Sequence, residues 1–249
     1  MGQAIDAAGD IVGYYLDASG NVDGFLLSGG TYNIIDYPGA QYTYLYGTND
    51  LGQVVGTSSA SSSGFLYDVA TQTFTTISYP NASGTFPLAI NNAGTIAGTV
   101  EHGANEFQGF VLVGATYRHI APPRTIDSSV NGITASGTLF GMAANRTAVL
   151  TFSFEKGNYS ERVIPNAPRA VANGVNPAGT ALVGFYTPSS GTTAGFLYQS
   201  KTLTTLQFPG SNNTMANGIN AGGEVVGTFV DANGGYHAFT WAPTERERK

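Results

Sequence analysis

One unit of about 43 residues recurs six times along this chain, and no other feature constrains the fold as strongly. Each unit carries a glycine after a pair of small or apolar residues, at Gly13, Gly56, Gly98, Gly141, Gly184 and Gly227. A second mark, in phase with the first, is a phenylalanine that usually follows glycine: Phe25, Phe65, Phe110, Phe152, Phe196 and Phe239. Prolines 38, 80, 122, 165 and 209 form a third mark. Three marks in phase indicate a tandem repeat that covers the whole chain.

Each unit contains four short segments typical of β-strands. In the second unit they are residues 44–48, 53–58, 64–67 and 73–77, and the first two are joined by a turn from Asn49 to Gly52. A four-stranded meander of this size cannot bury both faces alone, so copies must stack. We therefore predict an all-β, six-bladed β-propeller, one domain over residues 1–249, with repeats at about 3–45, 46–87, 88–130, 131–172, 173–216 and 217–242 and a charged tail at 243–249. An open β-solenoid or stacked β-prism is the alternative.

Composition agrees with short strands and tight turns, because the chain has 34 Gly, 14 Tyr and 14 Phe but only 10% charged residues. The net charge is −6 and basic residues are scattered, so we expect no nucleic acid partner. No apolar run is long enough to cross a membrane. We recognise no signal peptide ahead of the first repeat, and therefore expect either a cytosolic protein or a mature or truncated piece of a secreted one. The absence of cysteine excludes disulfides and thiolate chemistry.

The sixth unit also carries a recognisable family motif. The segment 218–227, followed by His237, Ala238 and Phe239, resembles the bacterial extracellular HAF-type repeat, as do residues 24–39 and 64–77. The resemblance extends over essentially the whole chain and is weakest in the fourth unit. It implies a β-propeller-like repeat protein of bacteria, often secreted or on the cell surface, and it brings no catalytic residues with it.

Loops that join second to third strands, and links between units, should share one face of the ring, and they vary in sequence. Function tends to lie on variable loops held by a rigid frame. Charged residues that break the repeat gather in these segments: Glu101, His102, Arg124, Arg146, Arg169 and His237. They could form a polar pocket for an anionic or hydroxylated ligand, with Glu101, His102 or His237 as acid or base. Alternatively they are ordinary solvated loop residues.

A second candidate set comes from one position of each first strand, occupied by Gln3, Tyr46, Leu88, Asn131, Asn173 and Asn217. These side chains could ring the channel and bind ligand, or their amides could bond backbone of the neighbouring blade. Tyr14, Tyr15, Tyr42, Tyr44, Tyr79 and Tyr186 could stack on sugars or fill the core. The acidic segments 17–23 and 231–234 suggest a calcium loop only faintly, and we expect no metal or cofactor.

Three functions are compatible with these patterns: a non-catalytic module that binds a glycan, small molecule or protein; an enzyme (hydrolase, lyase or isomerase) with one asymmetric site at the channel mouth; and a structural surface protein. A deep pocket lined by Glu101, His102, Arg124 or His237 would favour the enzyme. On the binding hypothesis, Arg124→Ala or His237→Ala should weaken binding, and Asp50→Ala in a short turn should change neither binding nor stability. The oligomeric state is not indicated.

The sequence predicts an incomplete last blade. Five units contain a fourth strand, but Phe239 is followed by Pro243 and a charged tail, and proline donates no ladder hydrogen bond. We expect the ring to close by side-chain packing, with an exposed edge at residues 238–241 that the charges of the tail protect. A fourth strand upstream of residue 1 is the alternative. We also expect Gly56 and its five counterparts to permit close packing between blades.

Overall fold

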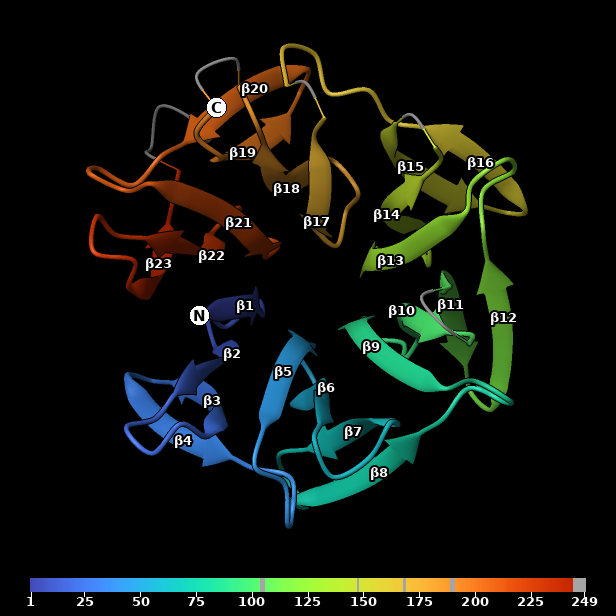
Figure 1. The fold of residues 1–249 in the computed structure, drawn as a ribbon, viewed down its shortest axis with the longest axis vertical. Coiled ribbons are helices and arrows are strands. Elements are labelled where there is room, and N and C mark those ends of the chain that lie inside the picture. The colour runs from blue at the N-terminus through green and yellow to red at the C-terminus, as the bar shows by residue number, and fades with distance from the viewer. Residues whose placement is uncertain (104–105, 147, 168, 189–190, 244–249) are drawn as a thin grey trace.

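A computed structural model describes residues 1–103, 106–146, 148–167, 169–188 and 191–243, in which 23 β-strands and no helices occur. The strands form six separate antiparallel sheets, and Figure 1 shows these sheets arranged as blades around a central channel. The fold is therefore the predicted six-bladed β-propeller, with a last blade of three strands. Because the described residues form no helix, they contain none that could span a membrane.

Five blades have four strands and the sixth has three. Blades one and two comprise β1 (Gly2–Ile5), β2 (Ile11–Leu16), β3 (Val22–Ser28), β4 (Thr31–Ile35), β5 (Thr43–Thr48), β6 (Gln53–Ser58), β7 (Gly64–Asp68) and β8 (Thr73–Ile77). Blades three and four comprise β9 (Gly84–Ile90), β10 (Ile96–Glu101), β11 (Phe107–Val113), β12 (Thr116–Ile120), β13 (Asp127–Ile133), β14 (Leu139–Ala144), β15 (Val149–Glu155) and β16 (Asn158–Glu161). Blades five and six comprise β17 (Val171–Val175), β18 (Ala181–Tyr186), β19 (Ala194–Gln199), β20 (Thr202–Leu206), β21 (Asn213–Ile219), β22 (Val225–Val230) and β23 (Tyr236–Trp241).

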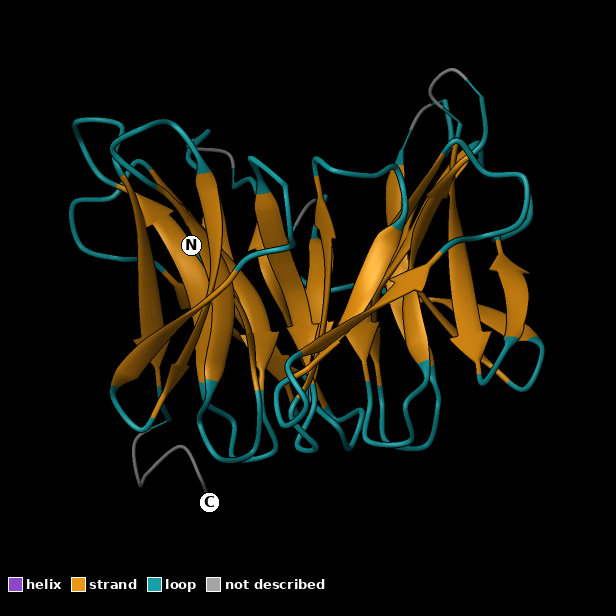
Figure 2. Ribbon diagram, turned by 90° about the horizontal axis from the view of Figure 1, so that it is seen from below, coloured by secondary structure: helices purple, strands orange, loops and turns teal. Residues whose placement is uncertain are grey.

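The short turns follow the chemistry predicted for them. The Asn49 side-chain oxygen accepts hydrogen bonds from the backbone N–H groups of Leu51 and Gln53 at 3.1 and 3.0 Å, and Gly52 has φ +71°. This conformation favours glycine because a Cβ would be strained there. Since strands alternate direction, these turns lie on one face of the ring and the longer loops and links lie on the other (Figure 2).

The core lies between the blades. The repeat phenylalanines of blades two, three and five, Phe65, Phe110 and Phe196, are completely buried. The last residue of a fourth strand joins them: Ile77, for example, belongs to one cluster with Ile90 and Phe110 of blade three. Each blade thus covers the next, and a single blade has no complete core of its own.

The repeat glycines pack closely, but within a blade rather than between blades, so that prediction is wrong. A Cβ on Gly56 would lie 2.2 Å from the Tyr44 carbonyl oxygen and 2.7 Å from the Phe65 ring, both in blade two. The reason is a register shift between Leu45 and Gly47, which pushes the inner strand against its neighbour. The close contact between blades is made by inner-strand glycines instead, such as Gly47, where a Cβ would lie 2.8 Å from the Leu88 carbonyl oxygen.

The structure also contradicts the neutral role predicted for Asp50. Its carboxylate accepts a hydrogen bond from the Ala7 N–H of blade one at 2.8 Å and another from the Asn92 side-chain amide of blade three at 2.6 Å. The Asp50 N–H donates in turn to the Asn92 side-chain oxygen at 2.9 Å. This short turn therefore ties three blades together, and Asp50→Ala should reduce stability.

The ring closes where β1 meets blade six, without a shared strand. β1 pairs with β2 of its own blade, and Gly2 packs so closely against Val226 that a Cβ would lie 2.5 Å from it. The side-chain amides of Asn217 and Asn220 add hydrogen bonds to the Gly2 and Asp6 carbonyl oxygens at 2.8 and 3.0 Å. Packing closes the ring as predicted, and these amide bonds reinforce it. The tail proposed to protect the edge lies outside the described residues.

Candidate binding site in the central channel

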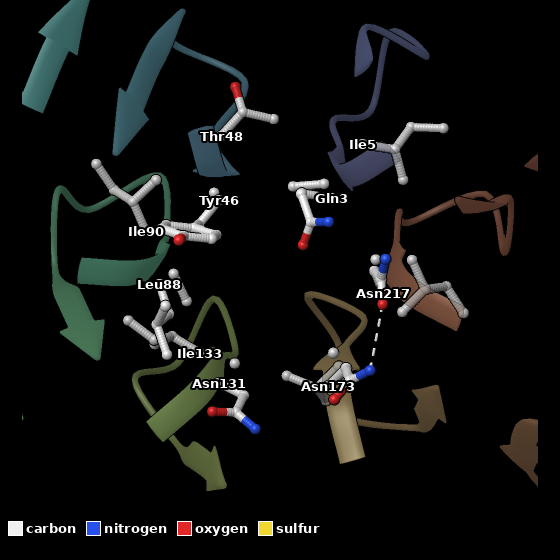
Figure 3. Close-up of a pocket in the computed structure, with 18 residues that line it drawn as sticks. Gln3, Ile5, Tyr46, Thr48, Leu88, Ile90, Asn131, Ile133, Asn173 and Asn217 are labelled. Carbon is white, nitrogen blue, oxygen red and sulfur yellow. Dashed lines mark hydrogen bonds between the residues drawn. The ribbon is translucent and has the colours of Figure 1, made fainter. Parts of the chain in front are cut away.

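The channel holds a cavity of about 310 Å³, lined by one three-residue step of every inner strand: residues 3–5, 46–48, 88–90, 131–133, 173–175 and 217–219. The register with the second strand shifts at the first residue of each step, so that this residue has no partner in that strand. Figure 3 shows the labelled first and third residues around the channel. The middle residue is Gly or Ala in all six blades. Small residues are needed there, since a Cβ on Gly174 would lie 2.7 Å from the Asn217 carbonyl oxygen of the next blade.

The first residues of these steps form a ring, hereafter the polar ring: Gln3, Tyr46, Leu88, Asn131, Asn173 and Asn217. All six line the cavity, as the repeat position predicts. The three asparagines also donate to backbone of the following blade, from Asn131 to the Ala172 oxygen at 3.0 Å, from Asn173 to the Ala216 oxygen at 3.1 Å, and from Asn217 to the Gly2 oxygen. The alternative in which the amides bond backbone of the neighbouring blade therefore holds for the three asparagines, which also line the cavity.

Gln3 differs from the three asparagines. Its side chain points toward the middle of the channel (Figure 3) and makes no hydrogen bond with any residue that the structure describes. A glutamine amide offers two donated hydrogen bonds and an acceptor oxygen. Gln3 is therefore the polar-ring residue whose hydrogen-bonding capacity is most available to a ligand.

Beside Gln3, three tyrosines pack between blades one and two. The Tyr14 and Tyr44 ring centroids lie 4.9 Å apart in an edge contact, and Tyr44 and Tyr46 are stacked at 6.2 Å. Burial, together with the neighbouring tyrosines, raises the pKa of Tyr14 to about 12. Burial likewise raises the pKa of Tyr46, although a hydrogen bond with Thr57 opposes this. Tyr46 therefore presents a neutral phenol to the channel.

Below the polar ring, the third residues form an aliphatic collar interrupted by one threonine: Ile5, Thr48, Ile90, Ile133, Val175 and Ile219. The cavity is therefore polar at one level and apolar at the next. Apart from Tyr46, none of its lining residues carries an ionisable side chain. This arrangement suits hydrogen bonding to a neutral molecule, and Tyr46 is the one titratable side chain among the residues that line the cavity.

The charged candidates lie on the variable-loop face, but none of the six lines the channel cavity. Glu101 ends β10, and the His102 ring makes an edge contact with Tyr79 at 5.7 Å. Arg124 and Arg146 are exposed. His237 bonds Asp231 at 2.8 Å and stacks on Phe229, which keeps it at the rim of blade six. The asymmetric channel pocket that would favour an enzyme is therefore not formed by these residues.

Arg169 lines a different hollow of about 380 Å³, between β15, β16 and the link to blade five. Its neighbours there include Glu161, Arg162 and the exposed Val163. The Arg162 guanidinium is engaged with the Ser153 hydroxyl at 2.8 Å and lies over the Phe140 ring. The hollow is thus a structural feature of this link rather than an extension of the channel.

The acidic loops use their carboxylates to build turns. Asp17 accepts backbone hydrogen bonds from Ser19 and Asn21, both at 2.8 Å, and Asp231 does the same for Asn233 and Gly235 at 2.8 and 2.9 Å. Among the described residues, no group of three or more acidic or histidine side chains is placed to hold a metal ion.

Comparison with known proteins gives no family assignment from sequence: no family model and no curated protein matches the chain. Solved structures do match. TolB from Acinetobacter baumannii superposes with a TM-score of 0.65 at 12% identity over 94% of this chain, which spans 63% of that protein. A gluconolactonase from Xanthomonas campestris gives 0.60 at 12% identity, covering 96% and 86% of the two chains. The Aleuria aurantia lectin, solved with Fucα1-6GlcNAc, gives 0.58 at 12% over 97% and 91%. These similarities are to β-propellers of different functions, and at such identities they establish the fold alone.

Proposed function

We propose that this protein is a non-catalytic binding module that holds a small, neutral, hydroxyl-rich ligand in the mouth of its channel. The observation that carries this proposal is the polar ring, where amides and one phenol surround a cavity whose other lining residues cannot ionise. Amides both donate and accept hydrogen bonds, as sugar hydroxyl groups do. The cavity lies at the lower end of the roughly 300–1,000 Å³ typical of small-molecule sites.

Two neighbouring residues of the ring, Gln3 and Tyr46, offer a ligand different groups. Gln3 supplies donors and an acceptor that no described residue occupies, while Tyr46 offers an aromatic face and a hydroxyl group. The three asparagines hold the ring in shape through their bonds to the next blade. A preorganised ring of this kind loses little conformational entropy when a ligand binds. The HAF-type resemblance supports a secreted or cell-surface location, where glycans and free sugars are available.

The test is calorimetric titration with neutral monosaccharides, with Fucα1-6GlcNAc, and with a sugar acid as a charged comparison. We expect neutral ligands to bind better than the acid, because no cation lines the cavity. Gln3→Ala and Tyr46→Leu should each weaken binding about tenfold, equivalent to about 1.4 kcal/mol, with little change in melting temperature.

The loop residues supply the matched comparison. Arg124→Ala and His237→Ala alter the same face without touching the cavity lining, so they should leave the affinity for a channel ligand nearly unchanged. If they abolish binding while Gln3→Ala and Tyr46→Leu do not, the ligand sits on the loops, as the sequence pattern suggests, and the channel proposal is wrong. If none of the sugars binds, the proposed ligand class is wrong.

A further inference from the structure

The outer edge of blade six carries a second hollow, of about 220 Å³, with aromatic walls. Phe208 and Pro209 of the link from blade five form one side, and Phe239 and Trp241 of β23 form the other. No strand in the described part of the chain pairs with this edge of β23, which Figure 1 shows as the outermost strand of its blade. The hollow therefore adjoins an unpaired strand edge.

Blade two shows what fills the same place when a fourth strand is present. Phe74, the second residue of β8, lies 5.0 Å from the Tyr37 ring centroid, 5.1 Å from that of Phe65 and 4.6 Å from that of Tyr67. Three residues that line the hollow are at the same positions of the repeat as these rings. Phe208 corresponds to Tyr37, Phe239 to Phe65 and Trp241 to Tyr67. The hollow is thus an aromatic socket without its aromatic residue.

Blade three repeats the arrangement. Tyr117, the second residue of β12, lies 5.2 Å from Tyr79 and 5.9 Å from Phe110 between ring centroids. The fourth strands of blades one, two, three and five share one pattern, namely Thr, then Tyr, Phe or Leu, then two variable residues, then Ile or Leu: TYNII, TFTTI, TYRHI and TLTTL. The chain itself therefore specifies the strand that fits this kind of edge.

The last residue of the pattern also has a place at blade six. In blade two Ile77 pairs opposite Gly64 and is 3% exposed in the interface with blade three. Ala238 holds the position of Gly64 and faces the seam, which is the interface between blades six and one. Its Cβ lies 3.7 Å from the position that a Cβ would take on Gly2. Among the described residues, the buried cluster between blades six and one consists of Ile11, Phe25 and Val226, with Ile5 and Leu27 partly buried against it. An aliphatic residue opposite Ala238 would enlarge it.

We propose that the β23 edge is a strand-addition site for an extended segment of another polypeptide with the sequence Thr-(Phe/Tyr)-x-x-(Ile/Leu). The segment pairs antiparallel with β23, its aromatic residue lies opposite Trp241 and fills the socket, and its last aliphatic residue lies opposite Ala238. Main-chain hydrogen bonds to the edge supply affinity, and the socket supplies sequence preference. This site is separate from the channel and does not depend on the function proposed for it.

The probe is a synthetic peptide of residues 71–79, which contains Thr73–Ile77, added to the intact protein. Trp241 is the sole tryptophan of the chain, so its fluorescence reports directly on the socket. We expect a blue shift that saturates with peptide, and a peptide with Ala in place of Phe74 should bind at least about tenfold more weakly, as expected for an anchoring aromatic. On the protein, Phe208→Ala should weaken binding while Tyr236→Ser, outside the paired stretch, should not.

Three results would overturn the proposal. In the first, the Trp241 spectrum is unchanged and anisotropy of labelled peptide shows no binding. In the second, the Trp241 spectrum shifts with protein concentration alone and sedimentation shows a dimer that the peptide does not dissociate, which would make the occupant of the edge a second copy of this chain. Peptide binding that is insensitive to the Phe74 substitution would likewise exclude the socket as its basis.

Discussion

Blades five and six share a repeat motif but differ in how well they bury it. Phe196 of β19 is completely buried, whereas Phe239, at the same position of β23, is only partly buried and its neighbours Ala238 and Thr240 are exposed. The difference between the blades is β20, which pairs with β19 and has no counterpart beside β23 in the part of the chain that the structure describes. The comparison shows that the outermost strand, more than the motif itself, determines the burial of each blade.

The inner side of blade six shows no such deficit. Asn217 of its inner strand β21 and Asn220 of the turn that follows bond to blade one. Val225 and Val226 are completely buried. The weakness of blade six is therefore confined to its outer edge, and the seam with blade one is held near the channel. This separation makes it reasonable to test the edge and the channel independently.

The largest expected difference is in the two phenylalanines. Phe196→Ala should lower the free energy of unfolding by about 3–5 kcal/mol, because a fully buried aromatic leaves a cavity. Phe239→Ala should cost only about 1–2 kcal/mol, because much less area leaves the solvent. Urea denaturation of both variants measures the difference, and equal losses would contradict the burial comparison.

The repeat glycines should, in contrast, behave alike in both blades. A Cβ on Gly184 would lie 1.9 Å from the Val171 carbonyl oxygen, and on Gly227 2.2 Å from that of Met215. Gly184→Ala and Gly227→Ala should each lower the free energy of unfolding by about 1–3 kcal/mol through overpacking. Gly222→Ala, where the nearest atom is the end of the Asn220 side chain at 3.3 Å, is the control and should change the melting temperature little.

The amide bonds at the seam should contribute less than the core. Asn217→Ala removes the hydrogen bond to the Gly2 carbonyl oxygen. It should lower the free energy of unfolding by about 1–2 kcal/mol, since this oxygen is left unpaired. Asn131→Ala removes the corresponding bond between blades four and five and should cost a similar amount if the seam is an ordinary interface. A much larger loss for Asn217→Ala, measured by thermal unfolding, would show that closure depends on this residue.

The smallest effect concerns the loops of blades one and six at low pH. Backbone hydrogen bonds, above all from Asn21, hold the pKa of Asp17 below its usual value, while His237 and then the Gly235 N–H lower the pKa of Asp231. Their stabilisation is present above the usual carboxyl pKa of about 3.9 and is lost as the pH falls through the lower folded values. Amide chemical shifts of Asn21 and Gly235 should follow these two titrations, and Asp17→Asn should abolish only the first.

Much of the fold followed from periodicity. The strands of blade two were predicted to within a residue, because Asn49 and Gly52 mark a turn whose chemistry is local. The packing of Gly56 within its own blade was not predicted, because a register shift in a neighbouring strand cannot be inferred from spacing. Asp50 was likewise missed because its partners lie in two other blades.

For the site, the equivalence of inner-strand positions placed the polar ring correctly on the channel. The bonds from the asparagines to the next blade were one of the two alternatives considered. The sequence did not indicate that Gln3 would have no described partner, because this depends on side-chain reach. Charge alone favoured the loop residues, but the fold does not bring them to the cavity. The socket at Trp241 emerged only when blades with and without a fourth strand were compared.

Amide hydrogen exchange along β19 and β23 tests the central comparison most directly. Both strands follow the same motif and each pairs with the second strand of its blade, but only β19 is paired on both sides. Open edges exchange through local fluctuations, whereas central strands require larger openings. The account predicts strong protection along β19 and weak protection at the outward-facing amides of β23. Equal protection of the two strands would show that β23 is covered, and would contradict the incomplete sixth blade.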